Sequence, residues 1–227
     1  GCAGCAGCAG CAGCAGCADA GALATDLDAC LWLPEMFELG TAPTSYDAAR
    51  GGVRAGRETV KLFPGAQQVL RMLLPGGDQR FNGVKVAVAS STTEPQFAHC
   101  CLDQLRIDPA GERVECVADL VDYRQVYPGS KGRQHFPALR EESGVAWDRM
   151  LFFDDCTYGD NVRGPTVPNA PTRSAHLEPT LPASPQCRDV AASCPGTTCI
   201  RTPAGLTVDL FERGVAACLR GESGVVV

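Results

Sequence analysis

The stretch ALATDLDAC, residues 22–30, decides how this chain folds. Uncharged residues suited to burial precede Asp26, and a second carboxylate follows at Asp28. A short apolar run of this kind predicts a buried strand, Ala22 to Asp26. Because alternate residues of an extended chain face the same way, both carboxylates leave the strand on one side. Aspartate is also common in turns and helix caps, so the pair alone leaves both interpretations open.

Further apolar runs alternate with amphipathic segments downstream. This alternation is typical of parallel strands joined by crossover helices, so we expect an α/β domain over residues 22–220. The remaining predicted strands are Val84 to Ser90, Val117 to Val121, Met150 to Asp154 and Thr197 to Arg201. The predicted helices are Pro64 to Leu74, Pro95 to Leu105, Ser130 to Glu142 with a kink or late start at Pro137, and Thr207 to about Leu219.

Other segments lack this alternation. Residues 1–18 repeat Gly-Cys-Ala six times, and without large side chains to bury, residues 1–21 are predicted to be a disordered tail. The C-x-x-C spacing suits a soft metal, but no histidine or fixed loop supports such a site. The proline-rich residues 164–195 are predicted to form a long surface insertion, and residues 221–227 a C-terminal tail. Leu33 to Thr59 is expected to form a small irregular lid over the tip of the first strand.

Composition excludes several classes of protein. The chain has 227 residues, 45% of them hydrophobic and 20% charged, with a formal net charge of −6. Its charges are scattered, so we expect no nucleic-acid partner. Apolar runs are too short to span a membrane. Six of the 15 cysteines lie in the repeat, and the others have no framework spacing, so we expect a reduced, cytoplasmic monomer, with targeting left open because the sequence starts at Gly1.

Polar residues follow the predicted strands, where ligands bind in open parallel sheets. Ser90 and Ser91 supply hydroxyls that suit an oxyanion, although simple N-capping of the next helix explains them equally well. Lys131 falls at a predicted helix start, where the helix dipole disfavours a cation unless a phosphate is bound; the alternative is a lysine exposed to solvent. Asp154 and Asp155 end a buried strand and repel each other unless a cation or a lysine intervenes.

Taken in order, the D-x-D pair, the serine, the lysine and the D-D pair resemble the haloacid dehalogenase superfamily. The closer resemblance is to the magnesium-dependent phosphatase-one family of acid phosphatase type, whose members have a three-layer doubly wound parallel sheet and little or no cap. YPGSK and FFDD at this separation are far more specific than D-x-D alone. The matching stretches are LATDLDACLW (23–32), VKLFPGAQQVLRML (60–73), VAVASSTTE (86–94), VYPGSKGRQHF (126–136), MLFFDD (150–155) and TTCIRTPAGLT (197–207).

The resemblance implies a phosphomonoesterase that forms an aspartyl-phosphate. Asp26 would attack phosphorus, and Asp28 would protonate the leaving oxygen and later activate water. Mg²⁺ would be held by the Asp26 carboxylate, the Asp28 backbone carbonyl, Asp155 and waters. The family's substrates include phosphotyrosine-like groups and sugar phosphates, fructosamine phosphates among them, and this sequence does not choose between them.

The same resemblance assigns the phosphate contacts. Ser90 and Lys131 would hold phosphoryl oxygens with help from Ser91, while Asp154 would orient Lys131 or a metal-bound water. Three departures stand out: Cys30 replaces a usual threonine, Ser91 replaces a frequent arginine, and the stretch after Asp155 is longer than expected, which leaves open whether Asp160 or Asn161 supports the metal.

Two other classes of protein compete with the phosphatase interpretation. A phospho-signalling receiver domain also combines acids, a hydroxyl and a lysine, but there the lysine comes last, whereas here Lys131 precedes the final acidic pair. A catalytically silent phosphate-binding protein would fit the departures at Cys30 and Ser91. Because all the charged catalytic positions are intact, the active phosphatase is the preferred hypothesis.

Overall fold

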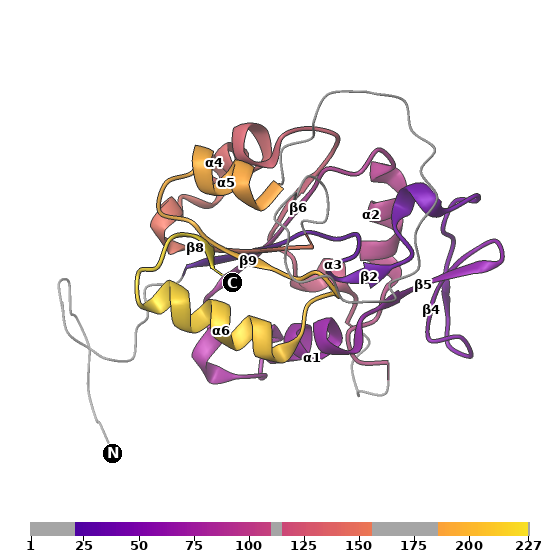
Figure 1. Ribbon diagram of the computed structural model, residues 1–227. Coiled ribbons are helices and arrows are strands. Elements are labelled where there is room, and N and C mark those ends of the chain that lie inside the picture. The colour runs from indigo at the N-terminus through magenta and orange to yellow at the C-terminus, as the bar shows by residue number, and fades with distance from the viewer. Residues whose placement is uncertain (1–20, 110–114, 156–185, 227) are drawn as a thin grey trace, which may run out of the picture.

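A six-stranded, wholly parallel sheet forms the centre of the computed structural model, which describes residues 21–109, 115–155 and 186–226 (Figure 1). The strand order is β10-β9-β8-β1-β6-β7. The prediction of a doubly wound α/β sheet is confirmed. The strands are β1 (Ala22–Thr25), β6 (Lys85–Ser90), β7 (Tyr123–Val126), β8 (Met150–Asp154), β9 (Thr198–Arg201) and β10 (Gly224–Val226).

The strand order reverses beside β1. From β1 the chain moves outward to β6 and β7, then returns to β8 on the other side of β1. Such a reversal opens a crevice at the carboxyl ends of the two strands that flank it. The backbone N–H of Asp26 donates to the carbonyl of Phe153 at 2.8 Å, which joins the two strand ends at this point.

Helices cover both faces of the sheet, and alternate strand residues supply the two cores. On one face Leu23, Leu151 and Phe153 pack with α1, α2, α3 and α6; on the other face Ala24 and Phe152 pack with α4 and α5 (Figure 1). The helices are α1 (Pro64–Leu73), α2 (Pro95–Gln104), α3 (Val117–Leu120), α4 (Phe136–Ser143), α5 (Gln186–Ser193) and α6 (Val208–Leu219).

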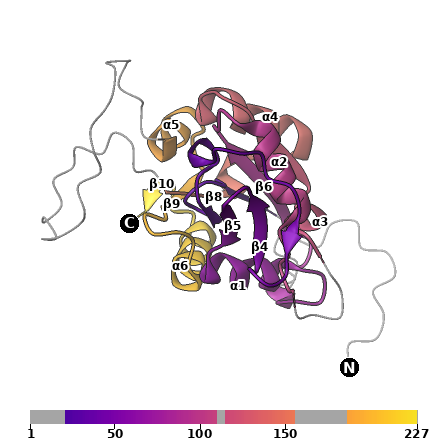
Figure 2. The same ribbon diagram turned by 90° about the vertical axis from the view of Figure 1, so that its right-hand side faces the viewer.

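A second, antiparallel sheet lies at one end of the molecule, where Figure 2 shows β4 and β5 in front of the main sheet. We call it the flap sheet; its order is β2-β5-β4-β3. It replaces the irregular lid that we expected from Leu33 to Thr59. The strand pattern was hard to recognise in the sequence because glycines interrupt it. Gly51 and Gly56, with φ of +66° and +60°, make the tight turns between the strands. Its strands are β2 (Trp32–Leu33), β3 (Tyr46–Asp47), β4 (Gly52–Ala55) and β5 (Glu58–Leu62).

The predicted helices are confirmed with small changes of boundary. Thr207 caps α6 by accepting a hydrogen bond from the N–H of Leu210 at 3.2 Å. The helix expected from Ser130 to Glu142 divides into a π-helical turn, η3 (Lys131–His135), and α4, and Pro137 lies in the first turn of α4. A proline is tolerated there because the first N–H groups of a helix have no partner within it. Short 3-10 turns are η1 (Met36–Glu38), η2 (Gln79–Phe81) and η4 (Trp147–Arg149).

Three predictions need correction. Val117 to Val121 is not a strand but contains α3, started by a capping box between Cys116 and Asp119; the strand is β7, just beyond it. The expected C-terminal tail contains β10, which pairs with β9. The expected insertion, residues 164–195, ends in α5. The repeat and residues 164–185 of that insertion lie outside the described residues. No helix in the described ranges is long and apolar enough to cross a membrane.

Candidate active site

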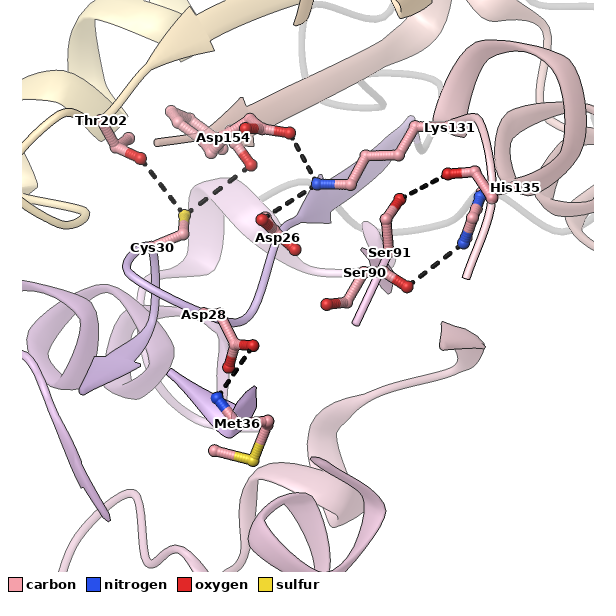
Figure 3. Close-up of polar contacts among 12 residues, drawn as sticks. Asp26, Asp28, Cys30, Met36, Ser90, Ser91, Lys131, His135, Asp154 and Thr202 are labelled. Carbon is pink, nitrogen blue, oxygen red and sulfur yellow. Dashed lines mark hydrogen bonds and ion pairs between the residues drawn. The ribbon is translucent and has the colours of Figure 1, made fainter. Parts of the chain in front are cut away.

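Three charged side chains meet at the carboxyl end of the strands that flank the crevice. Nζ of Lys131 lies 2.9 Å from Oδ2 of Asp26 and 2.7 Å from Oδ2 of Asp154 (Figure 3). All three are buried, and the Lys131 side chain is 0% exposed. The lysine is therefore not a solvated surface residue, which was the alternative that the sequence left open.

Each of these residues reaches the site from a different element. Asp26 directly follows β1, Asp154 is the last residue of β8, and the parallel pairing of Thr25 with Phe153 sets them side by side. Lys131 comes from η3, which follows the edge strand β7 in the chain and packs against α5 and β6. Its side chain also passes 5.4 Å from the centre of the Phe152 ring, a favourable distance for a cation and an aromatic face.

Burial dominates the electrostatics of this cluster. It raises the pKa of Asp26 to about 7; Lys131 opposes the rise, and Asp154, Asp155 and Asp28 add to it. Burial disfavours the Lys131 cation, but the carboxylates of Asp154 and Asp26 outweigh it and raise the pKa of Lys131. The lysine stays charged, and the site holds more negative charge than its one cation neutralises.

That excess of negative charge fits a divalent cation. Carboxylate oxygens of Asp26, Asp154 and Asp155 all lie within 4.8 Å of one another. Oδ1 of Asp26 is buried and has no hydrogen-bond partner within the described part of the chain. A buried oxygen left without a donor is costly unless a cation binds it, and hard oxygens are the ligands that Mg²⁺ prefers. The residues present therefore fit the metal that the sequence led us to expect.

The two candidate phosphate-binding serines have different surroundings. Ser90 is buried at the end of β6, next to β1 in the sheet. Ser91 is half-buried, and its hydroxyl donates to the carbonyl of Gly129 at 2.7 Å, so it contacts the loop that precedes Lys131. Figure 3 shows both serines on the Lys131 side of the site. The helix that follows is α2, which Ser90 and Ser91 do not cap; Glu94 is its N-cap.

Asp28 lies apart from the charged cluster. Its Oδ1 accepts from the indole N–H of Trp32 at 2.7 Å, and its Oδ2 accepts from the backbone N–H of Met36 at 3.1 Å. Both donors belong to the start of the flap sheet and η1, and Figure 3 shows the side chain directed toward Met36. Burial raises the pKa of Asp28, and the two hydrogen bonds partly offset that rise. The positive φ of Ala29, +55°, turns the chain between Asp28 and the flap.

His135 belongs to the site although the sequence analysis did not single it out. Its ring is buried; Nε2 lies 2.9 Å from the carbonyl of Tyr127 and 3.2 Å from that of Ser90, and Nδ1 lies 3.3 Å from that of Ser130. The ring thus joins the ends of β6 and β7 to the turn that carries Lys131. Its contacts are to backbone carbonyls, which leave no pattern of side chains in the sequence. Its spacing of four from Lys131 was the one available signal.

Cys30, where the resemblance led us to expect threonine, lies behind the nucleophile candidate. Its Sγ accepts from Oγ1 of Thr202 at 3.4 Å and donates to the carbonyl of Phe153 at 3.7 Å. Burial raises the pKa of this thiol well above its usual range, so it stays protonated. Cys30 therefore joins β8 and the loop after β9 behind Asp26, and it is no nucleophile itself. Asp160 and Asn161 lie outside the described residues.

Comparison with known proteins shows the family of the chain. A family model described as Acid Phosphatase matches residues 21–167. The chain belongs to this acid phosphatase family. It is 34% identical to human Magnesium-dependent phosphatase 1 over 134 residues, which cover 57% of this chain and 64% of that protein. It is 33% identical to a HAD-like hydrolase superfamily protein of Schizosaccharomyces pombe over 72 residues, 32% of this chain and 41% of the yeast protein.

The chain spans less than two thirds of the length of both curated relatives. Among solved structures, the phosphatase-domain-containing N-terminal part of a Bacteroides fragilis protein, complexed with Mg, aligns with a TM-score of 0.45 and 14% identity, covering 89% of this chain and 40% of that chain. Membership of the acid phosphatase family rests on the family model, which matches the region that holds Asp26, Lys131 and Asp154.

Proposed function

We propose that this acid phosphatase family member is a magnesium-dependent phosphomonoesterase in which Asp26 accepts the phosphoryl group. The observation that carries the proposal is the buried Asp26 carboxylate, with Oδ2 on Lys131 and Oδ1 without a hydrogen-bond partner in the described chain. The contact with Lys131 holds the carboxylate in one orientation, which positions it for attack on phosphorus. The resulting aspartyl-phosphate divides hydrolysis into two easier steps.

Mg²⁺ would be held by carboxylates of Asp26 and Asp155, together with the backbone carbonyl of Asp28, as the family resemblance suggests. When bound, it would neutralise charge on the phosphoryl group and lower the pKa of Asp26, which is about 7 without it. Asp26 would then be ionised at neutral pH. The excess of carboxylates over cations among Asp26, Lys131, Asp154 and Asp155 supports this role.

Ser90 and Lys131 would bind phosphoryl oxygens, and Asp154 would hold the Lys131 ammonium in place through its 2.7 Å contact. Asp28 would supply the proton for the leaving oxygen and take one from the attacking water. Burial raises the pKa of Asp28, which is the direction that favours a group that holds a proton. The Trp32 and Met36 donors hold this carboxyl against β2 and η1.

The proposed substrates are phosphate monoesters of the phosphotyrosine-like or sugar-phosphate type. The human relative is named for its dependence on magnesium and for phosphatase activity. Ser91 replaces a frequent arginine, and its hydroxyl donates to the carbonyl of Gly129. A serine cannot supply the cationic contact that an arginine would make with substrate groups distant from phosphorus. A panel of aryl and sugar phosphates ranked by kcat/KM would show which type is preferred.

The decisive experiment identifies the phosphorylated residue. With Mg²⁺ and p-nitrophenyl phosphate, the wild-type chain should release phosphate, EDTA should abolish the reaction, and Asp26→Asn should fall to background. Beryllium fluoride with Mg²⁺ should inhibit reversibly and form an adduct on Asp26. Mass spectrometry of peptides spanning residues 22–32 locates phosphate trapped on the chain. Undiminished turnover in Asp26→Asn, or phosphate on a different residue, contradicts the proposal.

A further inference from the structure

The turn that carries Lys131 is held from outside by one carboxylate. Oδ2 of Asp189, in the first turn of α5, accepts from the Ser130 hydroxyl at 2.5 Å and from the Gly132 backbone N–H at 2.9 Å. Ser130 and Gly132 are the two chain neighbours of Lys131. One oxygen atom therefore binds the backbone or side chain on both sides of the lysine, and it does so without touching Lys131 itself.

Ser130 connects this contact to the start of η3. While its hydroxyl donates to Asp189, its oxygen accepts from the backbone N–H of Arg133 at 3.1 Å and so caps the turn. The O–H orientation needed for one bond leaves the lone pairs free for the other. Asp189, Ser130 and Arg133 thus form a short chain of hydrogen bonds. Asp189 determines how the Ser130 hydroxyl, which caps η3, is oriented.

Close packing makes this contact specific. A Cβ added to Gly132 would lie 2.4 Å from the backbone oxygen of Asp189 and 2.9 Å from Cβ of Ser193, so only glycine lets α5 approach. The Cys194 thiol also donates to the carbonyl of Gly132 at 3.4 Å. Helix α5 and η3 are therefore in direct backbone contact, and a small movement of either would be transmitted to the other.

Lys131 needs this support because its long side chain is placed by its backbone. Its ammonium must lie between Asp26 and Asp154, at 2.9 and 2.7 Å. The lysine side chain has four methylene groups, about which it rotates freely when nothing restrains it. His135 holds the inner side of the same turn through the carbonyls of Tyr127 and Ser130. Asp189 holds the outer side of the turn through the Ser130 hydroxyl and the Gly132 N–H.

We propose that Asp189 is a positioning residue that sets the place of the Lys131 ammonium in the phosphate site. The inference rests on the proposed phosphatase function. It makes a specific claim beyond that function: loss of the clamp should weaken phosphate binding and turnover, whereas binding of Mg²⁺ at Asp26 and Asp155 should be unaffected. A merely structural role for α5 would weaken both together.

The test compares four variants of the full chain with p-nitrophenyl phosphate as substrate and inorganic phosphate as inhibitor. Asp189→Ala removes the clamp, and Asp189→Asn keeps one acceptor oxygen that can still serve both donors. Ser130→Ala removes one donor and leaves the Gly132 bond. The matched control is Asp209→Ala, which removes an acid from the first turn of α6, where its side chain is 80% exposed.

In Asp189→Ala we expect kcat/KM to fall about 10-fold to 100-fold and inhibition by phosphate to weaken at least about fivefold, the scale expected when a catalytic group is displaced by a fraction of an ångström. The Mg²⁺ concentration for half-activation should stay within about twofold. Asp189→Asn should recover most of the loss, Ser130→Ala should fall in between, and Asp209→Ala should match the wild type within about twofold.

The outcomes separate this inference from the proposed function. If the wild type releases no phosphate with Mg²⁺, or Asp26→Asn stays active, the proposed function fails. If the wild type is active and both Asp189→Ala and Ser130→Ala equal it, the positioning role fails. Parallel weakening of phosphate and Mg²⁺ binding also overturns it. Should Asp189→Ala melt below the assay temperature, Ser130→Ala decides by the same criteria.

Discussion

Two carboxylates leave β1 two residues apart, yet two different regions of the molecule hold them. The edge of the main sheet holds Asp26 through charge, since Lys131 lies 2.9 Å away between it and Asp154. The flap sheet holds Asp28 through neutral donors, the Trp32 indole and the Met36 N–H. Burial raises the pKa of both, but only Asp26 has a cation in direct contact.

This difference explains how one residue type can serve two purposes. A carboxylate beside a buried ammonium is a fixed acceptor, suited to bind a metal and attack phosphorus. A carboxyl that faces neutral donors can gain and lose a proton without leaving an unpaired cation behind. The main sheet therefore builds the surroundings of the proposed nucleophile, while the segment of residues 32–62, which holds the flap sheet, builds those of the proposed acid and base.

The largest effect expected from breaking this division is that of Asp28→Asn. Attack by Asp26 remains possible, but the proton donor and base are lost, so steady-state turnover should fall about 10²-fold to 10⁴-fold. With a leaving group that needs no proton, such as p-nitrophenolate, a first burst should remain and phosphorylated enzyme should accumulate. Rapid-quench kinetics with intact-mass measurement checks this.

Asp47→Asn is the control, because Asp47 is an acid of the same flap sheet that contacts the N–H of Ala49 and lies away from Asp28. We expect it to stay within about twofold of the wild type, as surface substitutions usually do. Loss of the burst in Asp28→Asn would mean that Asp28 is needed for attack itself, and the division of roles would be wrong.

Next in size is the loss of stability in Lys131→Met. Removing the cation leaves Asp26 and Asp154 buried and facing each other, which should lower the free energy of unfolding by about 3–5 kcal/mol. Lys61→Met, in the exposed part of the flap sheet, should change it by less than about 0.5 kcal/mol. Urea denaturation at pH 7 measures both. Equal losses in the two variants would show that the buried Lys131 contributes no more to the free energy of unfolding than an exposed lysine does.

The charged part of the site was predictable from the sequence for a physical reason. Asp26, Ser90 and Asp154 each end an apolar run, and parallel strands bring such ends to one edge. The helices that start at Pro64 and Pro95 were equally clear, since proline fits the first helical turn. Residues that follow periodic, buried elements can be placed by pattern alone.

The parts of the fold and of the site that the sequence did not predict depend on contacts between segments far apart in the sequence. Strand β7 reads YRQV and was missed because, as an edge strand, it carries arginine and glutamine, while the apolar Val117 to Val121 beside it folded as a helix. The strand pairing of the flap sheet was missed because short strands alternate there with tight turns that contain glycine. His135 contacts backbone carbonyls, and Asp189 contacts a hydroxyl and an N–H 57 to 59 residues away in the sequence, so no local motif reveals them.

A third prediction concerns pH in the metal-free chain. Because the folded-state pKa of Asp26 is about 7 against 3.8 ordinarily, the native state binds the extra proton between these values. Stability from this group is therefore complete below about pH 4 and is lost as pH rises to about 7, by up to about 4 kcal/mol. In EDTA, the wild type should lose more stability than Asp26→Asn between pH 5 and 8.

Added Mg²⁺ should reverse that loss, because a ligand that binds only the native state stabilises it and keeps Asp26 ionised. Thermal melts of the wild type and Asp26→Asn at each pH, with and without Mg²⁺, give the comparison. A wild-type pH profile that coincides with that of Asp26→Asn in EDTA would show that Asp26 does not titrate in this range.

Trp32→Phe should have a smaller effect, restricted to the Asp28 side of the comparison. It removes the indole N–H bonded to Oδ1 of Asp28 and keeps most of the buried ring. We expect kcat to fall about 10-fold, which is about 1.4 kcal/mol, a usual value for one hydrogen bond to a charged group. KM and phosphate inhibition should be unchanged, since the Lys131 side is intact. A rise in KM without a fall in kcat would place Trp32 in substrate binding.

The smallest effect is expected at Cys30, in the turn that follows β1. The thiol accepts from Thr202 at 3.4 Å and donates to Phe153 at 3.7 Å, so it makes the same two connections that a threonine hydroxyl would make, with softer bonds. Cys30→Thr should therefore change the free energy of unfolding by less than about 1 kcal/mol and kcat by less than about threefold, because volume is nearly conserved.

Cys30→Ala separates the hydrogen bonds from the volume. It leaves a small cavity behind Asp26 and leaves the buried Thr202 hydroxyl without its acceptor, so it should cost about 1–3 kcal/mol and lower kcat more than Cys30→Thr does. Chemical denaturation and steady-state kinetics of the two variants together give the answer. If Cys30→Ala is as active and as stable as the wild type, the sulfur does not support the nucleophile, and the main-sheet environment of Asp26 is fixed by Lys131 and Asp154 alone.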